Sequence, residues 1–351
     1  MTGPVARVLL VADTHLGFDL PLHPRVERRR RGFDFFANLE RALEPARRGE
    51  VDLVVHGGDL LFRSRVPDRL VQMAMAPLAQ VASTGVPVVL VPGNHERSRI
   101  PLSLWTVHPN LFIYRQPATL SFTVRGIRLA LAGFPCSRQG RDELAILLEQ
   151  TAYRQAPADI RLLCMHQTVE GAQVGVQDYT FRSGPDIIRG RDLPGDVAAV
   201  LAGHIHRAQA LKSDLKGRAL PAPVIYPGSV ERTAFAEREE VKGYAMLELQ
   251  PTSDGAGHLH SLQFIPLPTR PMIVLSIDLT GLTRPALEVL LHARLRELDP
   301  AAVVAIELRG TLTAGLAAAL GAGPLRALAP PTMNVEVRWP RDPNVPWKRR
   351  R

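Results

Sequence analysis

The sequence of 351 residues predicts an α/β (α+β) fold, namely a two-layer β-sandwich flanked by helices and followed by a small αβ domain. Two observations support the sandwich. Five apolar runs of strand length each lead into a short polar motif, and segments between them repeat apolar residues at helical spacing. A third observation supports the small domain, because a β-α-β-α-β pattern follows the proline-rich break at residues 266–271.

The first part of the chain alternates strands and helices. Buried strands are expected at residues 8–11, 53–55, 88–91, 162–164 and 197–201. A basic loop from His23 leads into a helix that reaches Arg48. A second helix, at 67–83, begins at a proline and ends before Gly85.

The middle of the chain is richer in β-structure. We expect a hairpin at 118–124 and 127–134, followed by a helix at 141–150. Four strands should then complete a second sheet, near 207–211, 222–227, 241–249 and 258–265. The segment 168–195 is glycine-rich and polar. Because loops of that length are usually functional, we expect it to be a loop that borders the active site.

A smaller pattern follows the proline-rich break. It consists of strand, helix, strand, loose helix and strand, expected at 272–279, 285–298, 303–308, 314–329 and 333–339. We therefore expect a domain at residues 1–267, a small domain at 268–340 and a basic tail at 341–351.

Composition narrows the class of protein. A hydrophobic content of 46% is ample for a packed core, and the net charge of +9 points to a polyanionic partner such as nucleic acid. An arginine-rich composition from a GC-rich genome would explain the charge without such a partner. Cys136 and Cys164 are expected as buried free thiols, which fits a reducing cytoplasm. The first apolar run ends at Asp13, and no run approaches the ~20 residues of a membrane span, so we expect no signal peptide, no membrane contact and a cytoplasmic location.

Each of the five strands leads into a polar motif. In chain order the motifs are Asp13-Thr14-His15, Gly57-Gly58-Asp59, Gly93-Asn94-His95-Glu96, Met165-His166-Gln167 and Gly203-His204-Ile205-His206. Taken singly, such motifs are usually turns or polar core groups. Taken together, they are expected along one edge of one sheet, where ligands bind in open α/β sheets.

The motifs supply the donors that two divalent metal ions need. These donors are carboxylate, amide and imidazole groups, from Asp13, His15, Asp59, Asn94, His166, His204 and His206. None is a thiolate, which argues against a structural zinc site or an iron–sulfur cluster. Mixed oxygen and nitrogen ligation suits Mn²⁺, Fe²⁺ or Zn²⁺. Two ions about 3.5–4 Å apart can stabilise both the attacking and the leaving oxygen of a phosphoryl transfer.

The order of these motifs resembles the calcineurin-like metallophosphoesterase superfamily. Residues 13–17, 58–62 and 226–235 are similar to segments of its DNA-repair exonucleases of the SbcD or Mre nuclease type. The resemblance covers residues 6 to about 250, with weaker similarity beyond. It implies that the small domain at 268–340 caps the metal site and contacts duplex DNA.

The resemblance implies a role for each motif residue. The first metal ion would be held by Asp13, His15, Asp59 and His206, and the second by Asp59, Asn94, His166 and His204, so Asp59 bridges. His95 would be the catalytic residue beside the phosphate, where it stabilises the transition state or protonates the leaving oxygen. A hydroxide bridging two Mn²⁺ ions would attack phosphorus in line. The other histidines are expected to be structural or at the surface, with His56 in the core or behind the ligands and His23 undecided.

The sequence departs from the SbcD-like pattern in two places. Those nucleases usually carry a histidine just after their second motif, and this chain has Arg63 there, with Arg65 close by. An arginine holds a phosphate but donates no proton at neutral pH, so the balance of exonuclease and endonuclease activity stays open. The helical segment that binds an SMC-like (SbcC-type) ATPase partner is also expected to be absent or very short. A homodimer formed through helices near 67–83 is a further implication of the resemblance.

Basic residues outside the motifs are candidates for DNA contacts. They are Arg28, Arg29, Arg30, Arg31, Arg63, Arg65, Lys348, Arg349, Arg350 and Arg351. The alternative interpretation is a solvated helix face for the first run and a solvated tail for the last.

Three functions compete on these observations. A metal-dependent DNA nuclease in DNA repair, an exonuclease and possibly also an endonuclease, is the preferred hypothesis. A metallophosphoesterase acting on phosphoproteins, nucleotides or small phosphate esters is the alternative, and the basic charge and the small domain argue against it. A DNA-binding subunit without catalysis is the third, and the complete ligand set argues against it.

Overall fold

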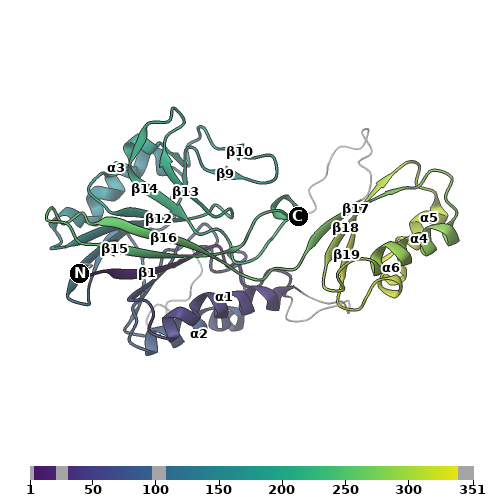
Figure 1. Cartoon of the computed structure of the whole chain (residues 1–351), viewed down its shortest axis with the longest axis horizontal. Coiled ribbons are helices and arrows are strands. Elements are labelled where there is room, and N and C mark those ends of the chain that lie inside the picture. Colours follow the sequence, from purple (N-terminus) through teal and green to yellow (C-terminus); the bar gives the residue numbers. More distant parts are fainter. Residues whose placement is uncertain (1–3, 21–30, 97–107, 339–351) are drawn as a thin grey trace. The chain divides into compact units, whose positions relative to one another are not determined.

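The computed structural model describes residues 4–20, 31–96 and 108–338 (Figure 1). The described residues form two compact units, one made of residues 4–20 and 31–269 and the other of residues 270–338. The units are described in turn. Within the described residues, no helix has both the length and the apolar character that crossing a membrane requires.

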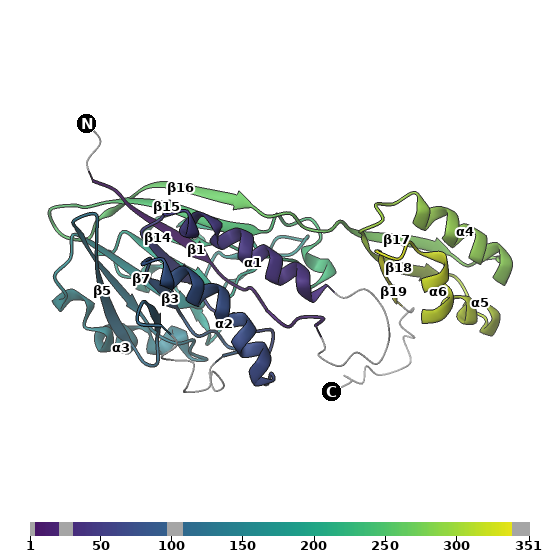
Figure 2. The same ribbon diagram turned by 90° about the horizontal axis from the view of Figure 1, so that it is seen from below.

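The first unit contains a six-stranded sheet with the order β16-β15-β1-β2-β3-β4 (Figure 2). Its strands are β1 (Ala6–Val11), β2 (Leu53–His56), β3 (Val88–Leu90), β4 (Leu111–Ile113), β15 (Gly243–Gln250) and β16 (His258–Pro266). Strands β1 to β4 run parallel, while β15 and β16 add antiparallel neighbours at the β1 side. The last two strands therefore extend the sheet that the N-terminal strand begins.

A second six-stranded sheet has the order β13-β14-β12-β7-β6-β5. Its strands are β5 (Ala118–Val124), β6 (Ile127–Gly133), β7 (Ile160–His166), β12 (Ala199–Gly203), β13 (Gln209–Ser213) and β14 (Ala219–Tyr226). One apolar cluster joins the two sheets, with Val8 and Val55 on one side and Leu131, Leu162 and Leu201 on the other. The predicted two-layer sandwich is thus confirmed.

Two predictions about the sheets are wrong. The strands that precede the five motifs do not share one sheet, because β1, β2 and β3 lie in the first sheet and β7 and β12 in the second. The strands expected at 241–249 and 258–265 join β1 rather than the strands at 209–226. Strand pairing is set by contacts between residues far apart in the chain, and the local apolar pattern does not encode them.

Helices cover the outer faces of the sandwich (Figure 2). Helix α1 (Gly32–Arg47) and helix α2 (Asp68–Ser83) pack on the first sheet, where Phe35, Leu39 and Met75 join the cluster that contains Leu9 and Val54. Helix α3 (Gly140–Thr151) and the short helix η2 (Tyr153–Gln155) cover the second sheet. The apolar residues of α2 are mostly buried within the unit, so its richness in methionine and leucine is explained by the core.

The segment 168–195 is more regular than the predicted loop. Strand β8 (Thr168–Val169) pairs with β11 (Ile187–Ile188), and β9 (Gln173–Val174) pairs with β10 (Tyr179–Thr180). A short helix, η3 (Gly190–Asp192), precedes β12, and another, η4 (Phe235–Glu237), precedes β15.

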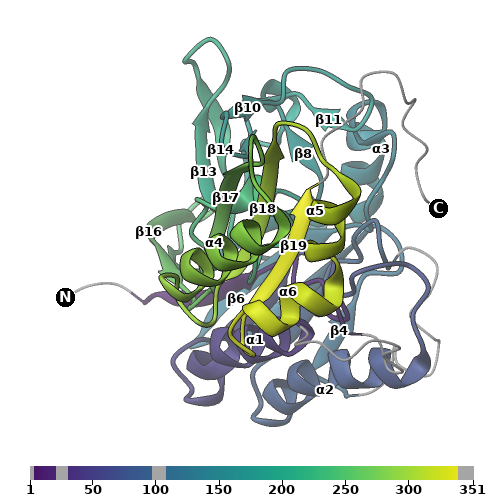
Figure 3. The same cartoon turned by 90° about the vertical axis from the view of Figure 1, so that its right-hand side faces the viewer.

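The second unit is a three-stranded parallel sheet covered by helices (Figure 3). Its elements are β17 (Met272–Asp278), α4 (Arg284–Arg296), β18 (Val303–Arg309), α5 (Ala314–Ala319), α6 (Ala322–Leu328) and β19 (Asn334–Arg338). Leucines on one face of α4 meet the strand side chains Val304 and Ile306 in the core. The single helix expected at 314–329 is two helices, since Pro324 fits the first turn of a new helix and not the interior of a continuing one.

Candidate metal centre

The ends of five strands from both sheets meet at one end of the sandwich. The backbone N–H of Asp13 donates to the carbonyl of Gly58 (2.9 Å), which joins the first two motifs within one sheet. The backbone N–H of His204 donates to the Asp13 carboxylate (3.0 and 3.1 Å), and His166 Nδ1 lies 2.8 Å from the carbonyl of Gly57. The last two contacts cross from one sheet to the other, and the third motif joins them because Asn94 Oδ1 lies 3.1 Å from His166 Nε2.

Two groups of donors lie side by side in this site. Asp13, His15 and His206 offer ligand atoms within 4.8 Å of one another, as do Asp59, His166 and His204. In the first group, His15 Nε2 and His206 Nε2 are 2.9 Å apart, as two ligands facing one ion would be. All of these groups are ones that divalent metals take in proteins, so the donor set fits two ions.

Asn94 and Asp59 complete the arrangement. The Asn94 Oδ1 atom lies 3.1 Å from His166 Nε2 and 3.2 Å from His204 Nδ1, which places it in the second group. The Asp59 carboxylate lies 3.5 Å from His166 Nε2, and it also shares a possible donor group with His15 of the first set. Asp59 therefore lies within reach of donors of both groups.

The backbone at four donors is in the left-handed region. The φ angles are 50° at Asp13, 42° at His15, 51° at Asp59 and 88° at His204. Each such residue costs about 1–3 kcal/mol and persists only where its surroundings enforce it. The strain is concentrated where the side chains must point at the site.

Two glycines allow the close approach of the motif loops. A Cβ on Gly93 would lie 2.2 Å from Asp59 Oδ1, and a Cβ on Gly203 would lie 2.2 Å from the carbonyl oxygen of Gly57. Glycine is therefore required at these positions by contacts with the donors and with the opposite sheet.

The electrostatics of the site keep most donors ready to bind. Burial raises the pKa of Asp13 to about 6 against the opposing effect of nearby histidines. Burial also lowers the pKa of His15 well below its usual value and that of His204 to about 4, which leaves both imidazoles neutral at pH 7. Burial disfavours the charged forms of both Asp59 and His166, but their mutual attraction outweighs it. The pKa of Asp59 is held well below its usual range, and that of His166 is raised to about 9.

Hydrogen bonds behind the donors fix their orientation. His166 Nδ1 donates to the Gly57 carbonyl, so its Nε2 atom faces Asn94 and the site. His56 is fully buried behind the donors, where its Nδ1 accepts from Gly58 N (3.2 Å) and its Nε2 lies 3.1 Å from Thr14 Oγ1. Burial lowers the pKa of His56 to about 3, so this histidine is a neutral link between the first two motifs.

Two glutamates near the site were missed by the sequence reasoning. Glu96, the last residue of the third motif, accepts hydrogen bonds from Leu61 N (2.7 Å) and Gly93 N (2.9 Å) and so ties two motif loops together. Burial raises the pKa of Glu96 to about 8. Glu237 lies 3.2 Å from His206 Nδ1. Glu96 could have been found from its place two residues after the donor Asn94, whereas no pattern marks Glu237, which lies in a charged run.

His95 stands beside the shared carboxylate and is partly exposed. Its Nδ1 donates to the Leu61 carbonyl (3.1 Å), its backbone N–H donates to Asp59 Oδ1 (3.1 Å), and its Nε2 lies 3.9 Å from Asp59 Oδ2. The geometry also groups His95 with His15 and Asp59 as a possible donor set. The Nε2 atom is thus free to meet either a substrate oxygen or a cation.

The basic residues predicted to contact DNA fall into three groups. Arg31 is buried; its guanidinium donates to the Arg232 carbonyl (2.7 Å) and lies 3.7 Å from Glu231. The prediction that Arg31 contacts a phosphate is therefore wrong. Arg63 and Arg65 are exposed, and the Arg63 guanidinium lies over the Phe62 ring at 4.7 Å. The remaining candidates, Arg28, Arg29, Arg30, Lys348, Arg349, Arg350 and Arg351, lie outside the described residues, as does His23.

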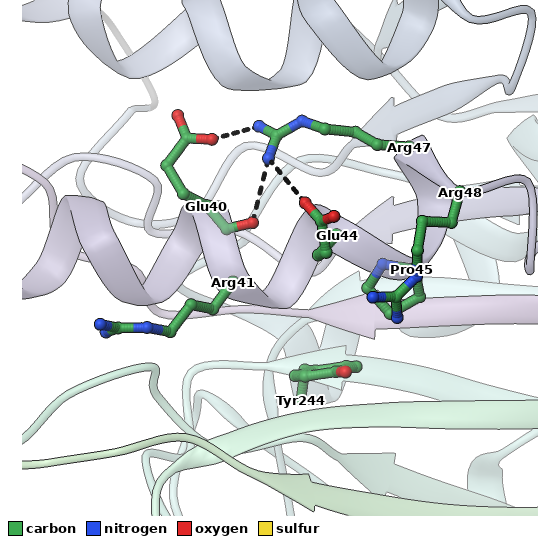
Figure 4. A pocket seen from close by; sticks show the side chains of 7 residues that line it. All are labelled: Glu40, Arg41, Glu44, Pro45, Arg47, Arg48 and Tyr244. Atoms are coloured by element: carbon green, nitrogen blue, oxygen red, sulfur yellow. Dashed lines mark hydrogen bonds and ion pairs between the residues drawn. The ribbon is translucent and has the colours of Figure 1, made fainter.

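A separate surface pocket of about 400 Å³ lies between α1 and Tyr244 of β15 (Figure 4). Its charged residues have both signs, and Arg47 pairs with Glu40 and Glu44. None of the metal donors lines it, so it is distinct from the candidate centre.

A comparison with known families identifies the larger unit. The sequence profile of the calcineurin-like phosphoesterases matches residues 6–208, which include all seven donors. The chain belongs to the calcineurin-like phosphoesterase family. The family assignment supports divalent metal ions at the centre described above.

Individual relatives of this family member carry a repair name. The chain is 30% identical to the DNA double-strand break repair protein Mre11 of Haloferax volcanii over 87% of this chain and 62% of that protein. It is 26% identical to Mre11 of Methanopyrus kandleri over 68% of this chain and 51% of that protein. A solved dimetal phosphatase from Danio rerio aligns with 75% of this chain and 98% of its own, at 15% identity and a TM-score of 0.45. The chain thus spans about half to two thirds of the length of these Mre11 relatives.

We predict that Asp59→Ala removes both metal ions and with them any hydrolytic activity, because one carboxylate serves both donor groups. Metal content measured after dialysis against dilute Mn²⁺ checks this. Two ions still bound to the folded variant would contradict the assignment of Asp59 as the bridge.

We also predict that Gly93→Ala lowers metal occupancy and costs about 1–3 kcal/mol of stability, since its new methyl group would displace the Asp59 carboxylate. Gly315→Ala is the matched control, because nothing lies within 4 Å of a Cβ at this position in helix α5. Thermal unfolding and metal analysis of both variants measure the difference. Equal behaviour of the two would show that the close approach at Gly93 is unimportant.

Proposed function

We propose that this protein is a metal-dependent nuclease that hydrolyses phosphodiester bonds of DNA during DNA repair. The observation that carries the proposal is the pair of adjacent donor groups, with Asp59 of the second group also within reach of His15 of the first. The printed names of the Mre11 relatives support DNA as the substrate, and the net charge of +9 suits a polyanion. The donor residues would hold two divalent ions, and we propose Mn²⁺ in preference to Fe²⁺ or Zn²⁺.

The chain's own residues have separate tasks in this reaction. Two bound cations would offset the charge that develops on the phosphoryl oxygens and lower the pKa of a bound water. Asp59 places its carboxylate between the donor groups. Asn94 contributes an uncharged amide oxygen, so more of the positive charge of the cations would act on the substrate phosphate. His95 presents Nε2 at the partly exposed side of Asp59, where it donates a proton to the leaving oxygen.

The contacts to DNA are proposed for exposed arginines close to the centre. Arg63 and Arg65 follow Leu61, whose carbonyl accepts the His95 hydrogen bond, so they lie next to the catalytic loop in the chain. Within the described residues, neither forms an ion pair, and both are available to phosphates. Because arginine replaces the histidine usual in SbcD-like nucleases, we propose endonuclease activity alongside exonuclease activity.

The described part of the small unit carries little net positive charge. Its described residues, 270–338, hold seven arginines against six acidic side chains. If it binds DNA, the attraction therefore comes from Lys348, Arg349, Arg350 and Arg351 more than from the folded unit. We also propose an SMC-like ATPase partner, pairing with a second copy of the chain and a cytoplasmic location, on the basis of the resemblance to SbcD-like nucleases.

We predict that His95→Ala leaves metal content and DNA affinity nearly unchanged and slows cleavage by about 10²–10⁴-fold, the range for a lost general acid. Metal analysis and cleavage of linear duplex, single-stranded and plasmid DNA with Mn²⁺ measure both quantities. A fall in metal content together with the rate would make His95 a ligand instead.

We further predict that duplex affinity falls steeply with salt, because each neutralised phosphate contributes about 0.9 to the slope of log affinity against log salt. Replacing Arg63 and Arg65 by alanine should reduce that slope by up to about 2 while sparing hydrolysis of a small chromogenic phosphodiester. Replacing Arg31 is expected to destabilise the fold instead, since it is buried. If the double variant keeps the full slope, these arginines do not bind DNA, and a flat salt dependence of the unaltered protein would favour small esters as substrates.

A further inference from the structure

We propose that Glu237 and Lys242 are positioning residues that hold His206 in the orientation needed to bind the first metal ion. Neither was predicted from the sequence, and neither belongs to the seven donors. The inference rests on the metal centre of the proposed function. It adds two residues that orient His206, one ligand of the first donor group.

Glu237 holds the ring of His206. Its Oε1 atom lies 3.2 Å from His206 Nδ1 and accepts a hydrogen bond from Thr233 Oγ1 at 2.7 Å. An ionised carboxylate only accepts hydrogen bonds, so the proton of the neutral imidazole is placed on Nδ1. The lone pair of Nε2 is then directed at the first donor group, where His15 Nε2 lies 2.9 Å away.

Lys242 holds that carboxylate in place. The Lys242 Nζ atom lies 2.7 Å from Glu237 Oε2 and 2.8 Å from Glu240 Oε2. The ammonium group therefore fixes the Glu237 side chain by a direct contact at one oxygen while the other oxygen faces His206.

Lys242 also holds the backbone of His206. Its third hydrogen bond goes to the His206 carbonyl at 2.9 Å, so all three N–H donors of a fully buried ammonium are satisfied. The same pair thus fixes His206 at the ring and at the main chain. Buried ion pairs are often no more stabilising than apolar residues of similar size, so this one calls for a reason beyond stability.

The effect should be confined to one ion. Glu237 and Lys242 contact His206 of the first donor group, whereas His166 of the second group is oriented by the Gly57 carbonyl. Loss of the positioning contact should therefore weaken one of the two ions more than the other. Removing a carboxylate behind a metal-binding histidine typically costs 10–100-fold in metal affinity.

The test titrates the full-length protein with Mn²⁺ by calorimetry and follows the spin-coupled signal of a two-manganese centre by electron paramagnetic resonance. In Glu237→Ala one ion should bind about 10–100-fold more weakly, the other should bind as before, and the coupled signal should be lost at low Mn²⁺. Glu237→Gln keeps an oxygen that accepts from Nδ1, so its loss of affinity should be smaller. Glu239→Ala is the matched control, because Glu239 is exposed in the same segment.

Two results would overturn the inference, and a third would overturn the proposed function. If Glu237→Ala is folded by circular dichroism and thermal melting and binds both ions as the unaltered protein does, the positioning role is overturned. An equal loss at both ions would also overturn it, because the contact is to one donor group. If the unaltered protein itself binds no pair of ions, the proposed function fails, and the inference fails with it for that separate reason.

Discussion

The centre depends on one electrostatic constraint, which is that the Asp59 carboxylate stays ionised while it is almost fully buried. Burial alone would raise the pKa of this carboxylate, and the neighbouring histidines, His166 above all, together have the larger, opposite effect. A bound cation would favour the ionised carboxylate in the same way. The donors around Asp59 come from strands of both sheets. Asp59 therefore has to lie at the junction of the two sheets, close to both donor groups.

Satisfying the polar groups behind such a site requires further buried polar residues. Glu96 accepts two backbone N–H groups of the motif loops, and His56 joins Thr14 to Gly58. Lys242 is satisfied by three oxygens. None of these groups is one of the seven donors, yet each holds a loop that carries a donor. The left-handed backbone at Asp13, His15, Asp59 and His204 is maintained by this surrounding network.

Much of the site could be predicted from the sequence because strands of apolar residues end in polar motifs, a local pattern. The same holds for helix α2, which begins directly after Pro67 and ends before Gly85. The division of the strands between two sheets could not be predicted, since it depends on pairing such as that of β1 with β15, more than two hundred residues apart. Arg31 was expected at the surface because a run of four arginines usually forms a solvated face. Its partners Glu231 and Arg232 lie far along the chain, so the local sequence gives no sign of its burial. Glu237 was missed because a glutamate among charged neighbours is usually exposed, whereas this one is buried.

The origin of the donors in both sheets has a consequence for how the protein matures. His15 and His206 are separated by 191 residues and meet only when the two layers have closed on each other. A nascent chain that has emerged only as far as Asn94 carries Asp13, His15, Asp59 and Asn94, which is an incomplete set for either ion. Binding of a complete pair of ions would therefore follow the synthesis and packing of β12. The early steps of folding would then proceed without help from bound ions.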